Sequence, residues 1–227
     1  GGGFIAEVRF KSEDPRKSVN PMRVPHYQTI DPFEYDEAKH GALYGTDGQR
    51  RLQSGYMGHF LCFPQFGAVS DAELHQDLGH HGEAVAVEWK KQRVESSPEG
   101  VTLRYSADLP KNQFRVERSI ALPADETVAY IEESAENMTM FDRPVNWVQH
   151  ITFGPPFMEP GKNYVDAPVV KNVLRDGDGV REIPWTTDLR MFPLTPKSRR
   201  YYAWLLDRSR PKVYFTMYNP DYSVLIG

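Results

Sequence analysis

VTLRYSADLPKNQFRVERSIALPADETVAYIEES, residues 101–134, alternates β-branched and aromatic residues with polar ones and is divided by short turns. The predicted strands are Val101–Ala107, Phe114–Leu122 and Val128–Ser134. Turn-forming residues stand between them, as Pro110-Lys111-Asn112 and Pro123-Ala124-Asp125. Successive strands joined by tight turns are typical of antiparallel sheets. This stretch therefore predicts three neighbouring antiparallel strands.

Strand patterns of the same kind extend to both sides of this stretch. They are Phe4–Phe10, Ala84–Trp89, Val145–Phe153, Tyr201–Leu206, Val213–Tyr218 and Tyr222–Ile226. The only helical signal is one turn at Asp36–Leu43, and no long amphipathic helix is indicated. We expect an all-β fold, an antiparallel sandwich or barrel, with residues 1–227 forming a single domain.

Composition excludes several classes of protein. Hydrophobic residues make up 40% of the 227, so a substantial core can form. The net charge of −4 comes from interspersed acidic and basic residues, which argues against a nucleic-acid partner. No apolar run approaches the length needed to cross a bilayer. Cys62 is the only cysteine, so no intrachain disulfide forms, which fits a reducing compartment and slightly favours the cytoplasm.

Both ends of the chain read as if flanking sequence were missing. Phe4–Phe10 has the pattern of a half-buried strand with almost nothing before it, and Tyr222–Ile226 is a strand followed only by Gly227. We expect truncation at both ends, because exposed strand edges invite mispairing. A leader that has been removed is compatible with this start. The Pro- and Tyr-rich residues 11–57 read as a long ordered loop, typical of a lid or an interface.

Three segments carry histidines in settings that suit chemistry. VNWVQHITFGPPF (145–157) places His150 near the end of a strand, before a Gly-Pro-Pro corner. Alternation there directs Trp147, Gln149 and Ile151 to one face and the remaining residues to the other, namely Asn146, Val148, His150 and Thr152. A held imidazole that titrates near neutrality suits general acid–base catalysis, although a histidine hydrogen-bonded at a sheet edge has the same pattern.

The other two segments are His80-His81-Gly82-Glu83 and the run MGHFLCFPQ, Met57–Gln65. Only one of the two adjacent histidines can enter a given pocket, and Gly82 permits close approach of a ligand or backbone. The second run carries His59 before aromatic residues that could form a floor under a sugar, or simply a core. The sequence lacks the spacing typical of a metal site, and Cys62 among apolar residues reads as a packed thiol.

Together, LCFPQFG (61–67), HHGEAVAVEW (80–89), RSIALP (118–123) and the 145–157 segment resemble the galactose mutarotase-like (aldose 1-epimerase-like) superfamily. The resemblance covers most of the chain and is clearest from Gly58 to Asp166. It implies a β-supersandwich with a sugar cleft. The implied activity exchanges the α and β anomers of a free sugar without a cofactor.

The resemblance also implies roles for individual residues. His150 would be the acid at the ring oxygen, and His81 would hold the ring oxygen or sugar hydroxyls beside it. The other substrate-binding candidates are Gln65, Glu83, Trp89, Trp147 and Phe157. Ring opening needs a proton removed from the anomeric hydroxyl and another delivered to the ring oxygen, which a histidine and a carboxylate can supply.

Two departures from the superfamily pattern bear on catalysis. Its enzymes commonly carry a sugar-binding arginine before the His-Gly pair, where this chain has Gln65 and no arginine between Arg51 and Arg93. Their base is a glutamate close to the C-terminus, whereas the last glutamate here is Glu182. Glu83, Glu159 and Asp166 are local substitutes whose settings are typical of surface carboxylates. Either the base lies beyond Gly227 or the chain does not epimerise.

Two classes of function therefore stay open. The chain is either a mutarotase-type isomerase acting on a small carbohydrate, or a non-catalytic carbohydrate-binding protein with the same cleft. The sequence indicates neither which sugar binds nor the oligomeric state.

Overall fold

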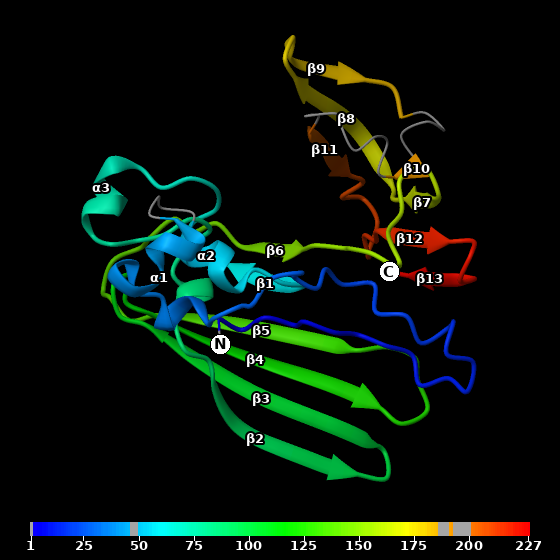
Figure 1. Ribbon diagram of the computed structural model, residues 1–227, viewed down its shortest axis with the longest axis horizontal. Coiled ribbons are helices and arrows are strands. Elements are labelled where there is room, and N and C mark those ends of the chain that lie inside the picture. Colours follow the sequence, from blue (N-terminus) through cyan, green and yellow to red (C-terminus); the bar gives the residue numbers. More distant parts are fainter. Residues whose placement is uncertain (1, 46–49, 186–190, 193–200) are drawn as a thin grey trace. The chain divides into compact units, whose positions relative to one another are not determined.

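The computed structural model describes residues 2–45, 50–185, 191–192 and 201–227, and most of its regular structure is strand (Figure 1). All strand pairs in it are antiparallel, which confirms the all-β prediction at this level. The chain divides into two compact units. The first comprises Gly1–Ala6 and Met22–Thr152, and the second Glu7–Pro21 and Phe153–Gly227. None of the described helices is long and apolar enough to span a membrane.

The first unit is built on a four-stranded sheet in the order β2-β3-β4-β5. Its strands are β2 (Lys90–Ser97), β3 (Gly100–Leu109), β4 (Phe114–Pro123) and β5 (Tyr130–Asn137). The last three lie where the alternation and turns of residues 101–134 predict them. Phe114 and Val116 of β4 are buried, as are Ala107 and Leu109 of β3, because alternate residues of a strand share one face.

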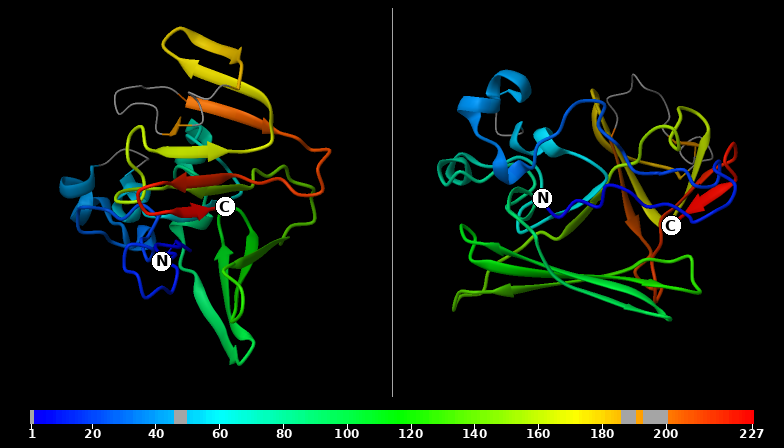
Figure 2. Two further views of the ribbon diagram at one scale, coloured as in Figure 1. Left: turned by 90° about the vertical axis from the view of Figure 1, so that its right-hand side faces the viewer. Right: turned by 60° about the horizontal axis from the view of Figure 1, so that its bottom comes forward.

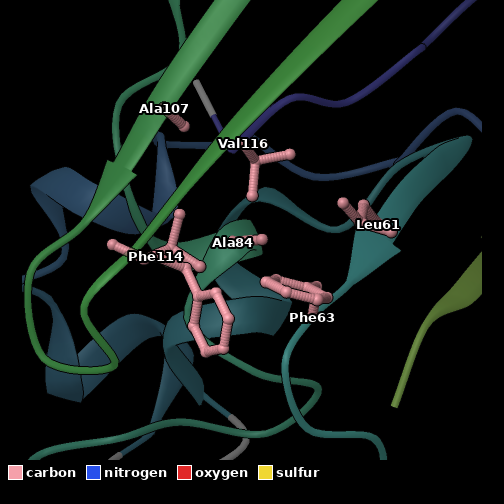
Figure 3. Packing of buried hydrophobic residues seen from close by; sticks show 7 residues of the cluster. Leu61, Phe63, Ala84, Ala107, Phe114 and Val116 are labelled. Atoms are coloured by element: carbon pink, nitrogen blue, oxygen red, sulfur yellow. The ribbon is translucent and has the colours of Figure 1, made fainter. Parts of the chain in front are cut away.

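A two-stranded ribbon, β1 (His59–Cys62) and β6 (Val148–Ile151), packs against this sheet. Leu61 and Phe63 of the ribbon segment and Ala84 join the buried face of the sheet in one hydrophobic cluster. Figure 3 shows the side chains of Phe114 and Val116 pointing from the sheet toward Leu61 and Phe63. Truncating such a buried side chain typically costs about 2–5 kcal/mol, so this cluster is what holds the ribbon on the sheet.

Short helical segments complete the first unit beside the ribbon (Figures 1 and 2). They are η1 (Pro32–Glu34), α1 (Glu37–Tyr44), α2 (Arg50–Gly55), α3 (Asp71–His75) and η2 (Ala84–Ala86). The helical turn predicted at Asp36–Leu43 is confirmed as α1, whose N-cap Asp36 accepts a hydrogen bond from the Ala38 amide. A second cluster, formed by Leu52, Phe60, Cys62 and Val85, fills the space between these segments and the ribbon.

The second unit contains two further sheets, in the orders β10-β7-β12-β13 and β11-β8-β9. Their strands are β7 (Asn163–Asp166), β8 (Val169–Asp176), β9 (Gly179–Ile183), β10 (Met191–Phe192), β11 (Tyr201–Leu206), β12 (Thr216–Asn219) and β13 (Val224–Ile226). The core of this unit gathers Val19, Phe157, Val165, Met217 and Val224. Residues 176–179 form the turn of the β8–β9 hairpin, in agreement with their Asp-Gly composition.

Three strand predictions need correction. Phe4–Phe10 forms only a single bridge, Ile5 to His59, and no strand. The segment Ala84–Trp89, predicted as a strand, begins instead as the 3-10 turn η2. The indole N–H of Trp89, which follows this turn, donates to the Ala84 carbonyl at 2.8 Å. The extended segment starts only at Lys90. The 145–153 segment forms the shorter strand β6, and its Gly-Pro-Pro corner belongs to the second unit.

Candidate functional site

Strand β6 presents His150 on the ribbon face that looks toward the helical segments. Phe60 of β1 is its direct cross-strand partner in the register. The two rings stack with centroids 4.6 Å apart and planes at 11°. Val148, two residues earlier on β6, packs with Phe60 in the second cluster, so the predicted alternation of this strand is confirmed.

His81 reaches the same place from the loop that precedes η2. Its backbone is left-handed, with φ +65°, and Gly82 follows with φ +88°. A Cβ on Gly82 would lie 2.5 Å from the Phe63 carbonyl oxygen, so only glycine fits where this loop passes the ribbon. The His81 amide donates to the Gly67 carbonyl at 3.0 Å, which ties down the other side of the loop.

The imidazoles of His81 and His150 are neighbours, with ring centroids 5.1 Å apart and planes at 73°. This distance confirms that the two histidines, distant in sequence, lie together, whereas the concave sugar pocket that they were expected to line remains a proposal. Both rings are half-buried. The His80 centroid is 5.8 Å from that of His81, so His81 is the member of the pair that faces His150.

Hydrogen bonds at Nδ1 define which atom each ring offers to a ligand. The Gly67 amide donates to Nδ1 of His81 at 3.4 Å, and the Cys62 Sγ lies 3.5 Å from the same nitrogen. With Nδ1 accepting, the proton of a neutral His81 sits on Nε2. His81 is therefore arranged as a hydrogen-bond donor through Nε2.

The ring of His150 is hydrogen-bonded to a chain of two hydroxyl groups. Nδ1 of His150 lies 3.5 Å from the Thr152 hydroxyl, and that oxygen lies 2.6 Å from the Tyr56 hydroxyl. A hydroxyl both donates and accepts, so this chain can be polarised in either direction. His150 can thus hold its proton on Nε2 or on Nδ1, which is the property that an acid–base group requires.

Burial sets the charge of both rings. Burial, followed by the nearby His150 and His80, lowers the pKa of His81 to about 4. Burial also lowers the pKa of His150 below its ordinary value. Both imidazoles are therefore neutral at pH 7. Neither ring contacts a carboxylate in the part of the chain that the structure describes.

Cys62 lies beside His81 without being activated by it. The thiol is buried, and burial raises its pKa to about 12. A thiolate is the reactive form of cysteine, so this side chain is inert at neutral pH, as the apolar surroundings in the sequence predict. Among the described residues, no group of three or more His, Cys, Asp or Glu side chains could hold a metal ion.

Gln65 and Glu83 meet at Asn112 and have no contact with the two rings. Glu83 accepts hydrogen bonds from the Lys111 amide at 3.0 Å and from the amide and side chain of Asn112 at 2.8 and 2.9 Å. Gln65 donates to the Asn112 side-chain oxygen at 3.2 Å. Glu83 is 3% exposed, so the expectation of a surface carboxylate is wrong. It stabilises the turn between β3 and β4.

The three aromatic candidates lie in different settings. The Trp89 ring is covered by the Arg118 guanidinium, whose Cζ is 4.4 Å from the ring centroid. Trp147 is 39% exposed and packs edge-on against Phe63. Phe157 is fully buried in the core of the second unit. Of these rings, only that of Trp147 offers an exposed face for stacking.

The predicted alternation placed Thr152 on the same strand face as His150, but the sequence did not identify Phe60 or Tyr56 as partners of this ring. Phe60 could have been found, because residues alternate along strands and the two strands carry MGHFLCFP and VQHIT. The pairing of these strands over a long sequence separation has no such local signal. Tyr56 comes from the long loop region, whose path periodicity does not predict.

A scan against protein-family models matched no family, and searches of curated proteins and of solved structures found no significant match.

Proposed function

We propose that the His81–His150 pair is a carbohydrate site of an aldose 1-epimerase-like isomerase in a galactose mutarotase-like supersandwich. The observation that carries the proposal is the 5.1 Å separation of two neutral, half-buried imidazoles from distant parts of the chain. A sugar ring presents several hydroxyl groups and a ring oxygen at similar spacing. The sequence resemblance supports the same pair of residues.

The polar atoms of the two rings suit complementary tasks. His81, a donor through Nε2, holds the ring oxygen or an adjacent hydroxyl. In its protonated form, which burial makes the minor form at pH 7, His150 delivers a proton to the ring oxygen as the C1–O5 bond breaks, and the neutral imidazole that results takes the proton back when the ring closes. The Thr152 hydroxyl, itself hydrogen-bonded to Tyr56, can either donate to Nδ1 of His150 or accept from it, so it can bind both the neutral and the protonated ring.

Anomer exchange also needs a base for the proton of the anomeric hydroxyl. The contacts of the two rings within the described residues include no carboxylate, and this observation favours a second candidate function. That candidate is a carbohydrate-binding protein that keeps the cleft without catalysing exchange. In either case the ligand is a small neutral carbohydrate, and no cofactor is required.

Exchange of glucose and galactose anomers, followed by polarimetry or NMR, tests the isomerase. We expect exchange faster than the buffer control, and loss of the acceleration in His150→Gln. Saturation-transfer NMR on the same samples detects binding separately. Binding without acceleration establishes the second candidate, and neither binding nor acceleration refutes both.

A further inference from the structure

The face of β6 opposite to His150 carries Gln149, whose side chain points toward the four-stranded sheet. Its amide donates to Oε2 of Glu133 on β5 at 2.5 Å. Its side-chain oxygen lies 2.6 Å from Nε2 of His59 on β1, which therefore acts as donor. Leu61 is the direct partner of Gln149, so His59 and Gln149 form a diagonal cross-strand pair on one face of the ribbon.

Glu133 is itself fixed from the other side. Its Oε1 forms an ion pair with Nε of Arg118 at 2.6 Å, and the two side chains are 4% and 3% exposed. Arg118 also donates to the Gly3 carbonyl at 2.5 Å and lies over the ring of Trp89. The carboxylate that receives Gln149 is therefore a rigid point of the sheet, because a nearly buried, paired charge has few alternative positions.

We infer that Gln149, Glu133 and His59 are the positioning residues of His150, holding β6 so that the imidazole stacks on Phe60 beside His81. A two-stranded ribbon of four-residue strands is marginal alone, so the twist of β6 against β1 is restrained by only four backbone residue pairs. The two directional hydrogen bonds of Gln149 restrain that twist, since one joins β6 to His59 on β1 and the other joins β6 to Glu133 on β5. The orientation of the opposite face, which carries His150, is restrained with it. The functional part of this inference rests on the proposed function, whereas its structural part does not.

The stacked geometry supplies a readout that is independent of catalysis. A histidine ring parallel to a phenylalanine ring at 4.6 Å has proton resonances displaced by the ring current of the phenylalanine. The His150 signals, assigned by their loss in His150→Gln, report whether the stack is present. His75, which is exposed on α3, gives the reference position of an unstacked ring.

Gln149→Leu is the principal variant, because Gln149 is exposed and its replacement leaves the buried Arg118–Glu133 pair in place. We expect the His150 resonances to move toward those of His75 in a protein that remains folded, with a lower melting temperature because Nε2 of the buried His59 ring loses its partner. Gln92→Leu is the matched control. Gln92 is an exposed glutamine of β2 that hydrogen-bonds only within the sheet, to Lys90 and Ser106. Its replacement should leave the His150 signals unchanged.

A pair of variants at His59 tests the hydrogen bond itself. His59→Gln keeps an N–H donor toward Gln149 and should retain the His150 shifts, whereas His59→Leu removes the donor and should lose them. Unchanged His150 shifts in Gln149→Leu would overturn the inference. Equal loss in His59→Gln and His59→Leu would contradict a role for the hydrogen bond.

Kinetics separate this inference from the proposed function. If the wild-type protein accelerates anomer exchange, Gln149→Leu should lower kcat by about 10²-fold, the scale of misplacing a catalytic group by roughly 1 Å, with KM unchanged. If the wild-type protein shows no acceleration but the ring shifts respond as described, the positioning role stands and the isomerase proposal fails.

Discussion

Phe60 and His150 are direct cross-strand partners on β1 and β6, and their rings are nearly parallel, 4.6 Å apart. The stack covers one face of the imidazole, and the neighbouring His81 ring lies at 73° to it. A phenylalanine at this position lowers the local polarity without competing for the proton. The stacking on Phe60 therefore accounts for a histidine that is both neutral and held at a defined angle. Variants of His150 and its neighbours can test both properties.

Replacing His150 separates a chemical role from a packing role. We expect His150→Gln to lower the rate of anomer exchange by about 10²–10⁴-fold, the usual contribution of general acid–base catalysis, because glutamine cannot transfer a proton in this way. The melting temperature should change little, since the ring is half-buried. Polarimetry and thermal unfolding measure both quantities, with His75→Gln as the control. A large fall in melting temperature with unchanged exchange would indicate a packing role.

The lowered pKa of His81 predicts a pH-dependent stability. The folded-state pKa of about 4 lies below the ordinary value of 6.5, so between these values the unfolded chain binds the proton that the folded chain excludes. The free energy of unfolding should therefore be at its full value above pH 6.5 and decrease as the pH falls toward 4. We expect His81 to contribute about 1–2 kcal/mol to this decrease, after allowance for partial exposure.

Urea unfolding at several pH values, for the wild type and His81→Gln, measures that contribution. The variant should show a shallower decrease between pH 6.5 and 4. Parallel curves for the two proteins would contradict a depressed pKa at this residue.

Replacing one member of the Arg118–Glu133 ion pair should lower the free energy of unfolding more than replacing both members. Arg118→Met leaves the Glu133 carboxylate buried without its partner, which typically costs about 3–5 kcal/mol. The double variant with Glu133→Leu removes both charges and should recover much of that loss. Urea unfolding of the two single variants and the double variant gives the coupling energy. Additive losses would show that the pair does not act as a unit.

Gly82 should be intolerant of a side chain for a steric reason. Gly82→Ala directs a Cβ against the Phe63 carbonyl, at 2.5 Å, and should cost about 1–3 kcal/mol beyond the left-handed backbone strain. Gly67→Ala is matched for that strain, since its φ is +90° against +88° at Gly82, and its Cβ meets nothing within 4 Å. Chemical unfolding should therefore rank Gly82→Ala as the less stable. Equal losses would mean that the loop moves away from the ribbon.

Cys62 should resist thiol reagents in the folded protein. The side chain is buried and its pKa is raised to about 12, so almost no thiolate exists at pH 7.5. Reaction with a chromogenic disulfide should be slow in buffer and rapid in urea, with one thiol released per chain. Rapid reaction of the folded protein would show that the space behind His81 opens to solvent.

Local alternation and burial agree in two of the strands that were predicted from sequence. β3 and β4 bury alternate residues, and their turns carry proline, so the pattern is visible in residues 101–122. β2 was missed because Lys90–Ser97 is an exposed edge strand without an apolar face. Phe4–Phe10 has the alternation of a strand, but only Ile5 finds a bridging partner. Pairing partners, unlike periodicity, are not a local property.

The same difference between local sequence patterns and long-range pairing applies to the candidate site. His81 and His150 were predicted on sequence grounds, and the structure brings their rings together. The residues that hold His150, among them Phe60 and Gln149, depend on how β1 pairs with β6 and on how this ribbon packs on the sheet. Glu83 was expected to be a surface carboxylate, because it lies in a polar segment. Nothing in the sequence indicated that three N–H groups would bind its carboxylate in a buried position.

The exposed strand β2 has a consequence for solubility. This edge strand carries Lys90, Lys91 and Arg93, and its pairing register with β3 shifts between Lys91 and Arg93. Positive charge and an irregular backbone both hinder a strand of another molecule from adding to the sheet. The β2 edge of the four-stranded sheet is thus protected against the addition of a foreign strand by the same residues that made β2 hard to recognise in the sequence.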